Sequence, residues 1–99
     1  MLESLTCADF LPRLHQQFTM RIDDTTVVGI ELVEAGESTV NPGMDGKRVP
    51  FSIVFRSAVQ DVLPQRIYRV SHAEMGAFDL FLVPIGRDAE GVRYEAIFS

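Results

Sequence analysis

The chain has 99 residues, of which 46% are hydrophobic and 23% are charged, and its formal net charge is −5. A domain most often holds ~100–150 residues, so we expect a single domain over residues 1–99, and the length excludes two-domain dehydrogenases, kinases and barrel enzymes of ~250 residues. The composition is typical of a globular protein and excludes a disordered or collagen-like chain.

The chain opens with the pattern of a short helix over about residues 6–14. Thr6 is placed to be the N-cap, and Asp9 to be the acidic partner in a capping box. Pro12 limits this helix, because the residue before a proline is disfavoured in the helical region. The predicted buried face of the helix consists of Phe10, Leu11 and Leu14.

From residue 16 onward the hydrophobic period changes to two, which predicts β-strands. Six such segments follow, over residues 16–22, 27–33, 49–56, 66–72, 78–83 and 92–98. The longest connection between them, 35–47, is rich in glycine and contains a Pro-Gly pair, which is typical of a loop. Segment 78–83 is apolar at nearly every position except Asp79, so we expect both of its faces to be covered.

Short connections favour antiparallel neighbours, because a parallel crossover needs a dozen or more residues. The fold class predicted is therefore all-β, a six-stranded antiparallel meander that curls into a small barrel or roll. In this arrangement the N-terminal helix would plug an open end of the barrel, and closure would remove exposed strand edges. The alternative is an α+β fold in which an open sheet packs on the helix.

Charge is unevenly distributed along the chain. Residues 1–46 carry a net charge of −6, whereas residues 47–69 carry a net charge of +4. An acidic half beside a basic segment fits association between copies of the chain, and a mixed solvated surface is the alternative.

The sequence also bears on partners and location. The acidic balance argues against nucleic-acid binding, which needs a basic surface. The longest apolar run, residues 80–85, is much shorter than the ~20 residues of a membrane helix, and the N-terminus lacks the regions of a signal peptide. Since Cys7 is the single cysteine, no intramolecular disulfide can form. We therefore expect a cytoplasmic protein that binds neither nucleic acid nor membranes.

Residues able to carry chemistry are few. His15 and His72 do not form a paired metal-ligand motif, and Cys7 has no second thiol beside it. A thiol at the start of a helix could act as a nucleophile. The alternative is that Cys7 packs as a small apolar side chain, which is the commoner role of a single cysteine. We therefore predict no catalytic residue, no metal and no cofactor.

The candidate interaction surface combines arginine and aromatic residues, which are enriched at protein interfaces. Its members are Arg56, Arg66, Tyr68, Arg69, His72 and Phe81. Strand alternation would place Arg56 and Arg69 on the outward faces of their strands and Tyr68 inward. The alternative is that the arginines form ordinary cross-strand pairs with Asp79, Glu95 or Glu31. A second candidate is the outer apolar face of the late strands, which either the N-terminal helix or a second subunit would cover. That face consists of Phe81, Val83 and Ile97.

Several segments resemble a small bacterial family of stand-alone domains of unknown function. The segments that carry the resemblance are Leu63-Pro64-Gln65, Tyr68-Arg69, His72, Met75-Gly76, 80–86 and 94–98, together with 5–12 at the start. Members of that family are sometimes encoded near phage-tail-collar-like proteins, so the resemblance implies an accessory or assembly role in a phage-tail-like system. It carries over no catalytic residue.

Three functions follow from these patterns, in order of preference. The first is a non-enzymatic protein-interaction or assembly protein that binds a protein partner or a second copy of itself. The second is a small-ligand-binding barrel, with its pocket at a mouth near Arg66, Tyr68 and His72. The third is a small enzyme that depends on Cys7 or a metal.

Overall fold

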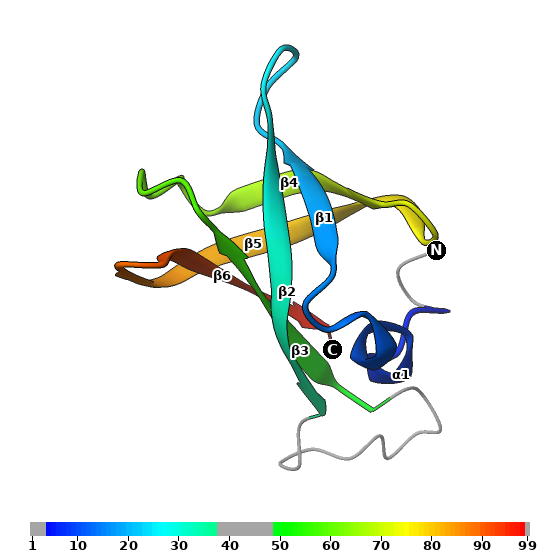
Figure 1. The fold of residues 1–99 in the computed structure, drawn as a ribbon. Coiled ribbons are helices and arrows are strands. Elements are labelled where there is room, and N and C mark those ends of the chain that lie inside the picture. Colours follow the sequence, from blue (N-terminus) through cyan, green and yellow to red (C-terminus); the bar gives the residue numbers. More distant parts are fainter. Residues whose placement is uncertain (1–3, 38–48, 99) are drawn as a thin grey trace.

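The computed structural model describes residues 4–37 and 49–98, and this part of the chain forms a closed β-barrel with a short helical segment at one end (Figure 1). The elements are α1 (Cys7–Phe10), the 3₁₀ turn η2 (Leu11–Arg13), β1 (Gln17–Arg21), β2 (Val27–Glu37), β3 (Phe51–Ser57), β4 (Arg66–His72), β5 (Gly76–Asp88) and β6 (Gly91–Phe98). The predicted fold class, an all-β antiparallel barrel of six strands, is confirmed for these residues, and the open-sheet alternative is not what forms.

The order of the strands around the barrel differs from a simple meander. It runs β1-β2-β3-β6-β5-β4 and closes where β4 pairs with β1, and every pairing is antiparallel. The barrel is thus made of two three-stranded meanders joined at β3–β6 and β4–β1. The connection between the meanders, residues 58–65, crosses one end of the barrel and does not turn back as a hairpin. This connection is longer than the two to five residues of a typical hairpin loop, so it can reach across the end of the barrel.

The largest departures of the strand boundaries from the prediction fall at two connections, β2–β3 and β5–β6. Residues 35–37, expected in a loop, continue β2, and the rest of that expected loop lies outside the described residues. Strand β3 begins at Phe51, two residues later than predicted. Strand β5 runs on to Asp88, so the connection to β6 is a tight turn. Inter-strand hydrogen bonds, which a hydrophobic pattern does not report, extend these strands beyond their apolar residues.

The interior of the barrel is filled by side chains from alternate positions of all six strands. Among the largest side chains that are fully buried are Phe18, Leu32, Phe55, Tyr68, Leu82 and Tyr94. The predicted two-residue alternation is therefore confirmed. The described chain covers only one face of 78–83, because Leu80 and Leu82 are buried whereas Phe81 between them is 52% exposed. A closed barrel covers only its inner face.

One end of the barrel is closed by α1, as predicted. Phe10 is fully buried, and its ring centroid lies 5.7 Å from that of Phe98, 5.9 Å from that of Phe51 and 6.3 Å from that of Phe78. The capping box is present, since the Thr6 backbone N–H donates to the Asp9 carboxylate at 2.8 Å. These contacts fix the helical segment across the mouth of the barrel.

The predicted buried face of that segment is partly wrong. Leu14 packs against the core, but Leu11 is 48% exposed. The α-helix ends at Phe10 and continues as a 3₁₀ turn that contains Pro12. Leu11 follows Phe10 directly, so it projects about 100° away from it around the helix axis and faces solvent when Phe10 faces the core.

The opposite end is closed by residues 58–65. The backbone N–H of Leu63 donates to the Tyr94 hydroxyl at 3.0 Å, and the Tyr68 hydroxyl donates to the carbonyl of Pro64 at 2.5 Å. Burial raises the pKa of Tyr94. Two tyrosines from different strands thus hold the crossing connection down on the barrel.

Gly91, at the turn between β5 and β6, is required by both conformation and space. Its φ is 137°, and a Cβ built on it would lie 1.9 Å from the carbonyl oxygen of Ser57 on β3. This close approach lies where β3 pairs with β6 and therefore where the two meanders meet. Neither helical segment among the described residues is long and apolar enough to cross a membrane.

Candidate functional site

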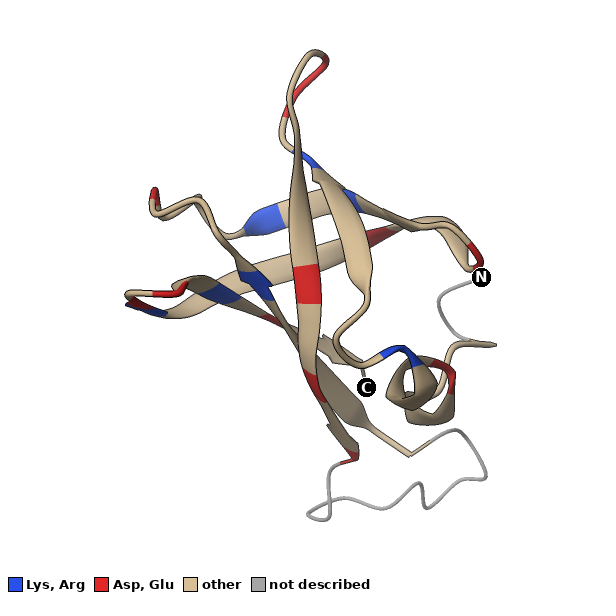
Figure 2. Cartoon of the chain, viewed as in Figure 1, with Lys and Arg blue, Asp and Glu red and all other residues tan. Residues whose placement is uncertain are grey.

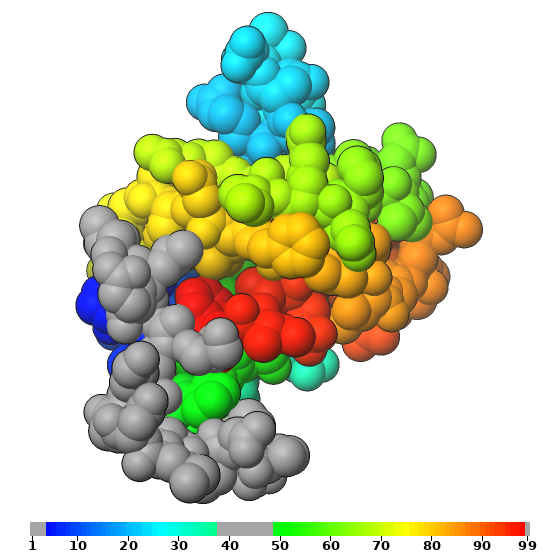
Figure 3. All heavy atoms as spheres, turned by 180° about the vertical axis from the view of Figure 1, so that it is seen from behind, coloured from blue at the N-terminus to red at the C-terminus, as the bar shows by residue number. Residues whose placement is uncertain are grey.

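Three large apolar side chains lie exposed on the outer face of neighbouring strands β4, β5 and β6. The exposed fractions are 65% for Ile67, 52% for Phe81 and 74% for Ile97. Ile67 is the cross-strand partner of Phe81. Val83 on β5 pairs with Glu95 on β6. Because the two strands are antiparallel, Phe81, two residues before Val83, and Ile97, two residues after Glu95, lie beside each other on the same face. We call Ile67, Phe81 and Ile97 the apolar row, and the strands that carry it form one continuous surface in Figure 3.

The N-terminal helix does not cover the apolar row. It packs at the end of the barrel against β2 and β3, with Phe10 among the core aromatics. The prediction that the N-terminal helix covers this face is therefore wrong, and cover by a second subunit remains a prediction. Large exposed apolar patches on a folded protein commonly mark interaction sites.

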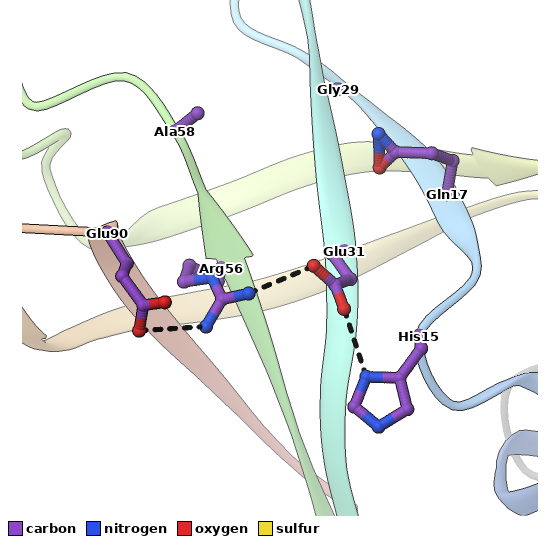
Figure 4. Close-up of a pocket in the computed structure, with 7 residues that line it drawn as sticks. All are labelled: His15, Gln17, Gly29, Glu31, Arg56, Ala58 and Glu90. Atoms are coloured by element: carbon purple, nitrogen blue, oxygen red, sulfur yellow. Dashed lines mark hydrogen bonds and ion pairs between the residues drawn. The ribbon is translucent and has the colours of Figure 1, made fainter.

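The outer face of β1, β2 and β3 is of a different kind (Figure 4). A depression of about 500 Å³, which we call the ion-pair pocket, is lined there by His15, Gln17, Gly29, Glu31, Arg56, Ala58 and Glu90. Glu31 lies at its centre. Its two carboxylate oxygens each lie 3.0 Å from a partner, the Arg56 guanidinium and the His15 Nδ1 atom, and Arg56 also lies 3.6 Å from Glu90.

The pocket's electrostatics follow from this arrangement. The hydrogen bond from His15 and the charge of Arg56 hold the pKa of Glu31 below its usual value of 4.5. Four of the lining side chains, His15, Glu31, Arg56 and Glu90, pair with one another. None of the lining residues carries a hydroxyl or a thiol, so the His15–Glu31 pair has no group of that kind beside it to activate.

Residues 5–98 match the family model of DUF6916, a domain of unknown function. The chain belongs to the DUF6916 family. The predicted resemblance to a domain family of unknown function is thus confirmed. No curated protein and no solved structure matches the chain.

The DUF6916 barrel separates the residues of the predicted interaction surface. Tyr68 is 2% exposed and belongs to the core, whereas Arg69 and Phe81 lie on the outer face. Arg56 lies in the ion-pair pocket. The cross-strand pairs considered as an alternative are present for two arginines, Arg56 with Glu31 at 3.0 Å and Arg69 with Asp79 at 3.2 Å.

Arg66 and His72, the two remaining members, lie at opposite ends of β4. Six residues of extended strand place them ~20 Å apart, so they do not line one mouth together with Tyr68. The Arg66 guanidinium lies over the Tyr68 ring, 4.7 Å from its centre, and donates to the carbonyl of Ile22. The His72 Nδ1 atom accepts the backbone N–H of Glu74 at 3.0 Å, and its Nε2 lies 2.8 Å from the side-chain oxygen of Gln16.

Cys7 lies in the core of the DUF6916 barrel. It is 3% exposed, and burial followed by the charge of Glu37 raises the pKa of its thiol. The packing role considered for it is the one the structure shows, because a buried neutral thiol is a poor nucleophile. Among the described residues, no group of three or more His, Cys, Asp and Glu side chains is arranged to hold a metal ion.

The prediction missed Ile67, the second-most exposed member of the apolar row. The signal was present, because Tyr68 was expected to point inward and strand alternation then turns Ile67 outward.

Proposed function

We propose that this DUF6916 chain is a non-enzymatic assembly protein that binds protein, in the first place a second copy of itself, through the outer face of β4, β5 and β6. The observation that carries the proposal is the exposure of Ile67, Phe81 and Ile97 side by side on three neighbouring strands. A protein partner that covered these side chains would remove them from water.

Burial of the apolar row supplies a useful part of the binding free energy. Fully burying one such side chain contributes ~1.5–3 kcal/mol, and each of the three is at least half exposed. Association costs an estimated ~4–15 kcal/mol in lost freedom. The apolar row therefore supports a weak or moderate interface by itself, and a stable interface needs further contacts around it.

The candidate chemistry supports an interaction role over catalysis. The thiol of Cys7 is buried in the core, and the His15–Glu31 pair faces a pocket that no hydroxyl or thiol lines. An accessory role in a phage-tail-like system is the finer form of the proposal, and its support is the resemblance drawn from the sequence. A cytoplasmic location is part of the proposal too, and its support is the N-terminal pattern of the sequence.

The test is sedimentation velocity over a concentration series. The comparison is between the wild-type chain and the double variant Ile67→Ser/Phe81→Ser, whose substitutions are both at exposed positions. We expect wild type to form species larger than one chain and the double variant to remain monomeric. Val62→Ser is the matched control, because Val62 is 51% exposed but lies outside the apolar row, and it should associate as wild type does.

Two results would contradict the proposal: a wild-type chain that is monomeric at every concentration, and a double variant that associates as strongly as wild type. Thermal melts followed by circular dichroism are the check that the double variant is folded, so that a loss of association is not assigned to unfolding.

A further inference from the structure

We propose that the outer face of β1 and β4 binds a phosphate group, either as free inorganic phosphate or as part of a small organic phosphate. The site, which we call the oxyanion site, consists of Thr19, Arg21, Arg69 and Ser71. The apolar row contributes no residue to it. The inference goes beyond self-association, because it assigns a small ligand to a different part of the surface.

The oxyanion site places two like charges opposite each other. Arg21 on β1 and Arg69 on β4 are direct cross-strand partners, and both face outward, because Met20 and Val70 beside them are buried. In Figure 2 basic positions of β1 and β4 lie close together near the upper end of β1. The Cβ atoms of such partners are only ~4.5–5.5 Å apart, and like charges there destabilise a sheet. An anion between the two guanidinium groups would make the same pairing favourable.

Two hydroxyl groups lie beside the arginines. Thr19 and Ser71 are cross-strand partners on the same face, and their hydroxyls hydrogen-bond to each other. That bond uses one of the two hydroxyl hydrogens, so the other is available to donate to a ligand. The partners on the flanking strands are small, Gly29 opposite Thr19 and Ala77 opposite Ser71, and they leave room above the hydroxyls.

The four side chains line a depression of about 220 Å³, together with Val27 and Ala77. A cavity of roughly 150 Å³ holds a benzene ring, so a phosphate group fits. Arginine binds phosphate oxygens with paired N–H groups, and hydrogen bonds of this kind are strengthened by charge. No carboxylate is among the residues that line the depression, in contrast to the ion-pair pocket.

Asp79 on β5 contacts the site from outside the depression. Its Oδ1 atom lies 3.2 Å from Nη1 of Arg69, and both side chains are more than half exposed, so water weakens the pair. The other N–H groups of Arg69 have no partner among the described residues. Arg69 can therefore donate to a ligand on one side while Asp79 stays on the other.

Arg21 has no acidic partner within the described chain. Its Nη1 atom donates to the backbone carbonyls of Asp23 and Asp24 at 3.4 and 3.3 Å, which are long hydrogen bonds. The Asp23 carboxylate accepts from the backbone N–H and the hydroxyl of Thr25 instead. With Asp79 balancing Arg69, the site keeps the positive charge of Arg21, and this charge selects an anion.

The test titrates the wild-type chain with inorganic phosphate at constant pH and ionic strength, followed by ¹H–¹⁵N correlation spectra. We expect saturable shift changes centred on the amides of the oxyanion site. Arg21→Gln and Arg69→Gln should each weaken phosphate binding about tenfold or more, because each removes charge-assisted hydrogen bonds. Both positions are exposed, so both variants should keep the fold.

Arg87→Gln is the matched control. It also removes one exposed arginine that forms no ion pair with a described residue, but Arg87 lies outside the site, so this variant should bind phosphate as wild type does. Asp79→Asn frees Arg69 and should tighten binding. Acetate at the same ionic strength should bind more weakly than phosphate, because it offers fewer oxygens to the donors.

Glycerol 3-phosphate distinguishes the two sources of the phosphate group. Tighter binding than that of inorganic phosphate identifies a small organic phosphate as the ligand, and weaker binding identifies the free ion. The inference is overturned if phosphate causes no saturable shift changes, if the changes are as large at Arg87 as at the oxyanion site, or if both arginine variants bind as wild type does. The measurement does not depend on self-association, so its failure and the failure of the proposed function are distinguishable.

Discussion

The two outer faces of this barrel differ from each other far more than the inward-facing positions of its two halves do. Outside β1, β2 and β3, Glu31 is held by His15 and Arg56, and Arg56 reaches Glu90. Outside β4, β5 and β6, the row of Ile67, Phe81 and Ile97 faces solvent. The inward positions of both halves are alike, since both are filled with buried aromatic and aliphatic side chains.

The difference separates what folding requires from what function requires. A barrel of this size is stabilised by its interior, so the outward positions are free to vary. Polar side chains that satisfy one another make a face that is stable in water. A face that keeps isoleucine and phenylalanine exposed is typical of a surface that contacts protein.

The largest expected effects are on the free energy of unfolding, and they test whether the two halves of the barrel share one core. Leu32 on β2 and Leu82 on β5 are both fully buried. We expect Leu32→Ala and Leu82→Ala each to lower the free energy of unfolding by ~2–5 kcal/mol, because each leaves a cavity in the same core. Urea unfolding measures both, and a loss confined to one half would contradict the view that the barrel has one shared interior.

The next effect tests the junction between the halves. Gly91→Ala should cost at least ~1–3 kcal/mol, because the new Cβ would need both a positive φ and space that the Ser57 carbonyl occupies. Gly76→Ala, with φ of 83° but open space, should cost less, and Gly36→Ala, with neither constraint, should cost least. Unfolding free energies in any other order would contradict this account of the β3–β6 junction.

A smaller effect concerns the charged face and is visible as pH dependence. The pKa of Glu31 is below 4.5 in the folded chain, so its contribution to stability is present above pH 4.5 and is lost as the pH falls through the lowered value. Glu31→Gln should therefore flatten the fall of the melting temperature below pH 4.5. Some of the fall should remain, because Asp23 also has a lowered pKa, caused chiefly by the backbone N–H of Thr25.

The control for this prediction is Glu34→Gln, on the same strand. Glu34 forms no ion pair with another described residue. The melting temperature of this variant should therefore fall more steeply below pH 4.5 than that of Glu31→Gln does. Equal flattening in both variants would show that the pairing of Glu31 with His15 and Arg56 is not the cause.

The smallest effect on stability is expected on the apolar row. Ile97→Thr replaces a side chain that is 74% exposed, on a strand position that favours a β-branched residue. We expect its free energy of unfolding to remain within ~0.5 kcal/mol of wild type. A loss as large as that of Leu82→Ala would mean that Ile97 serves the fold and not an interface.

The fold could be predicted to a large extent because its signals are local. The capping box at Thr6 and Asp9, the inward phase of Tyr68 and the closure of one end by the helix all follow from spacing within short segments. The pairing of β3 with β6 could not be read in the same way. It depends on where residues 58–65 cross the barrel, and the tyrosine hydroxyls that hold them, at 94 and 68, belong to other strands.

The candidate site was less predictable for the same reason. The pairs of Arg56 with Glu31 and of Arg69 with Asp79 were anticipated from strand alternation. The contact between Ile67 and Phe81 was not, because it depends on the register of β4 and β5. His15 joins Glu31 only because its backbone N–H pairs with the Leu32 carbonyl at 2.6 Å, a contact between distant parts of the chain.

The most direct test of the central claim is a concentration series of ¹H–¹⁵N correlation spectra of the wild-type chain. Association through the apolar row predicts that the largest shift changes with concentration fall at the amides of Ile67, Phe81 and Ile97. The ion-pair pocket around Glu31 should change little. Spectra that do not change with concentration, or changes centred on Glu31 and Arg56, would contradict the claim that the β4–β5–β6 face is the one built for assembly.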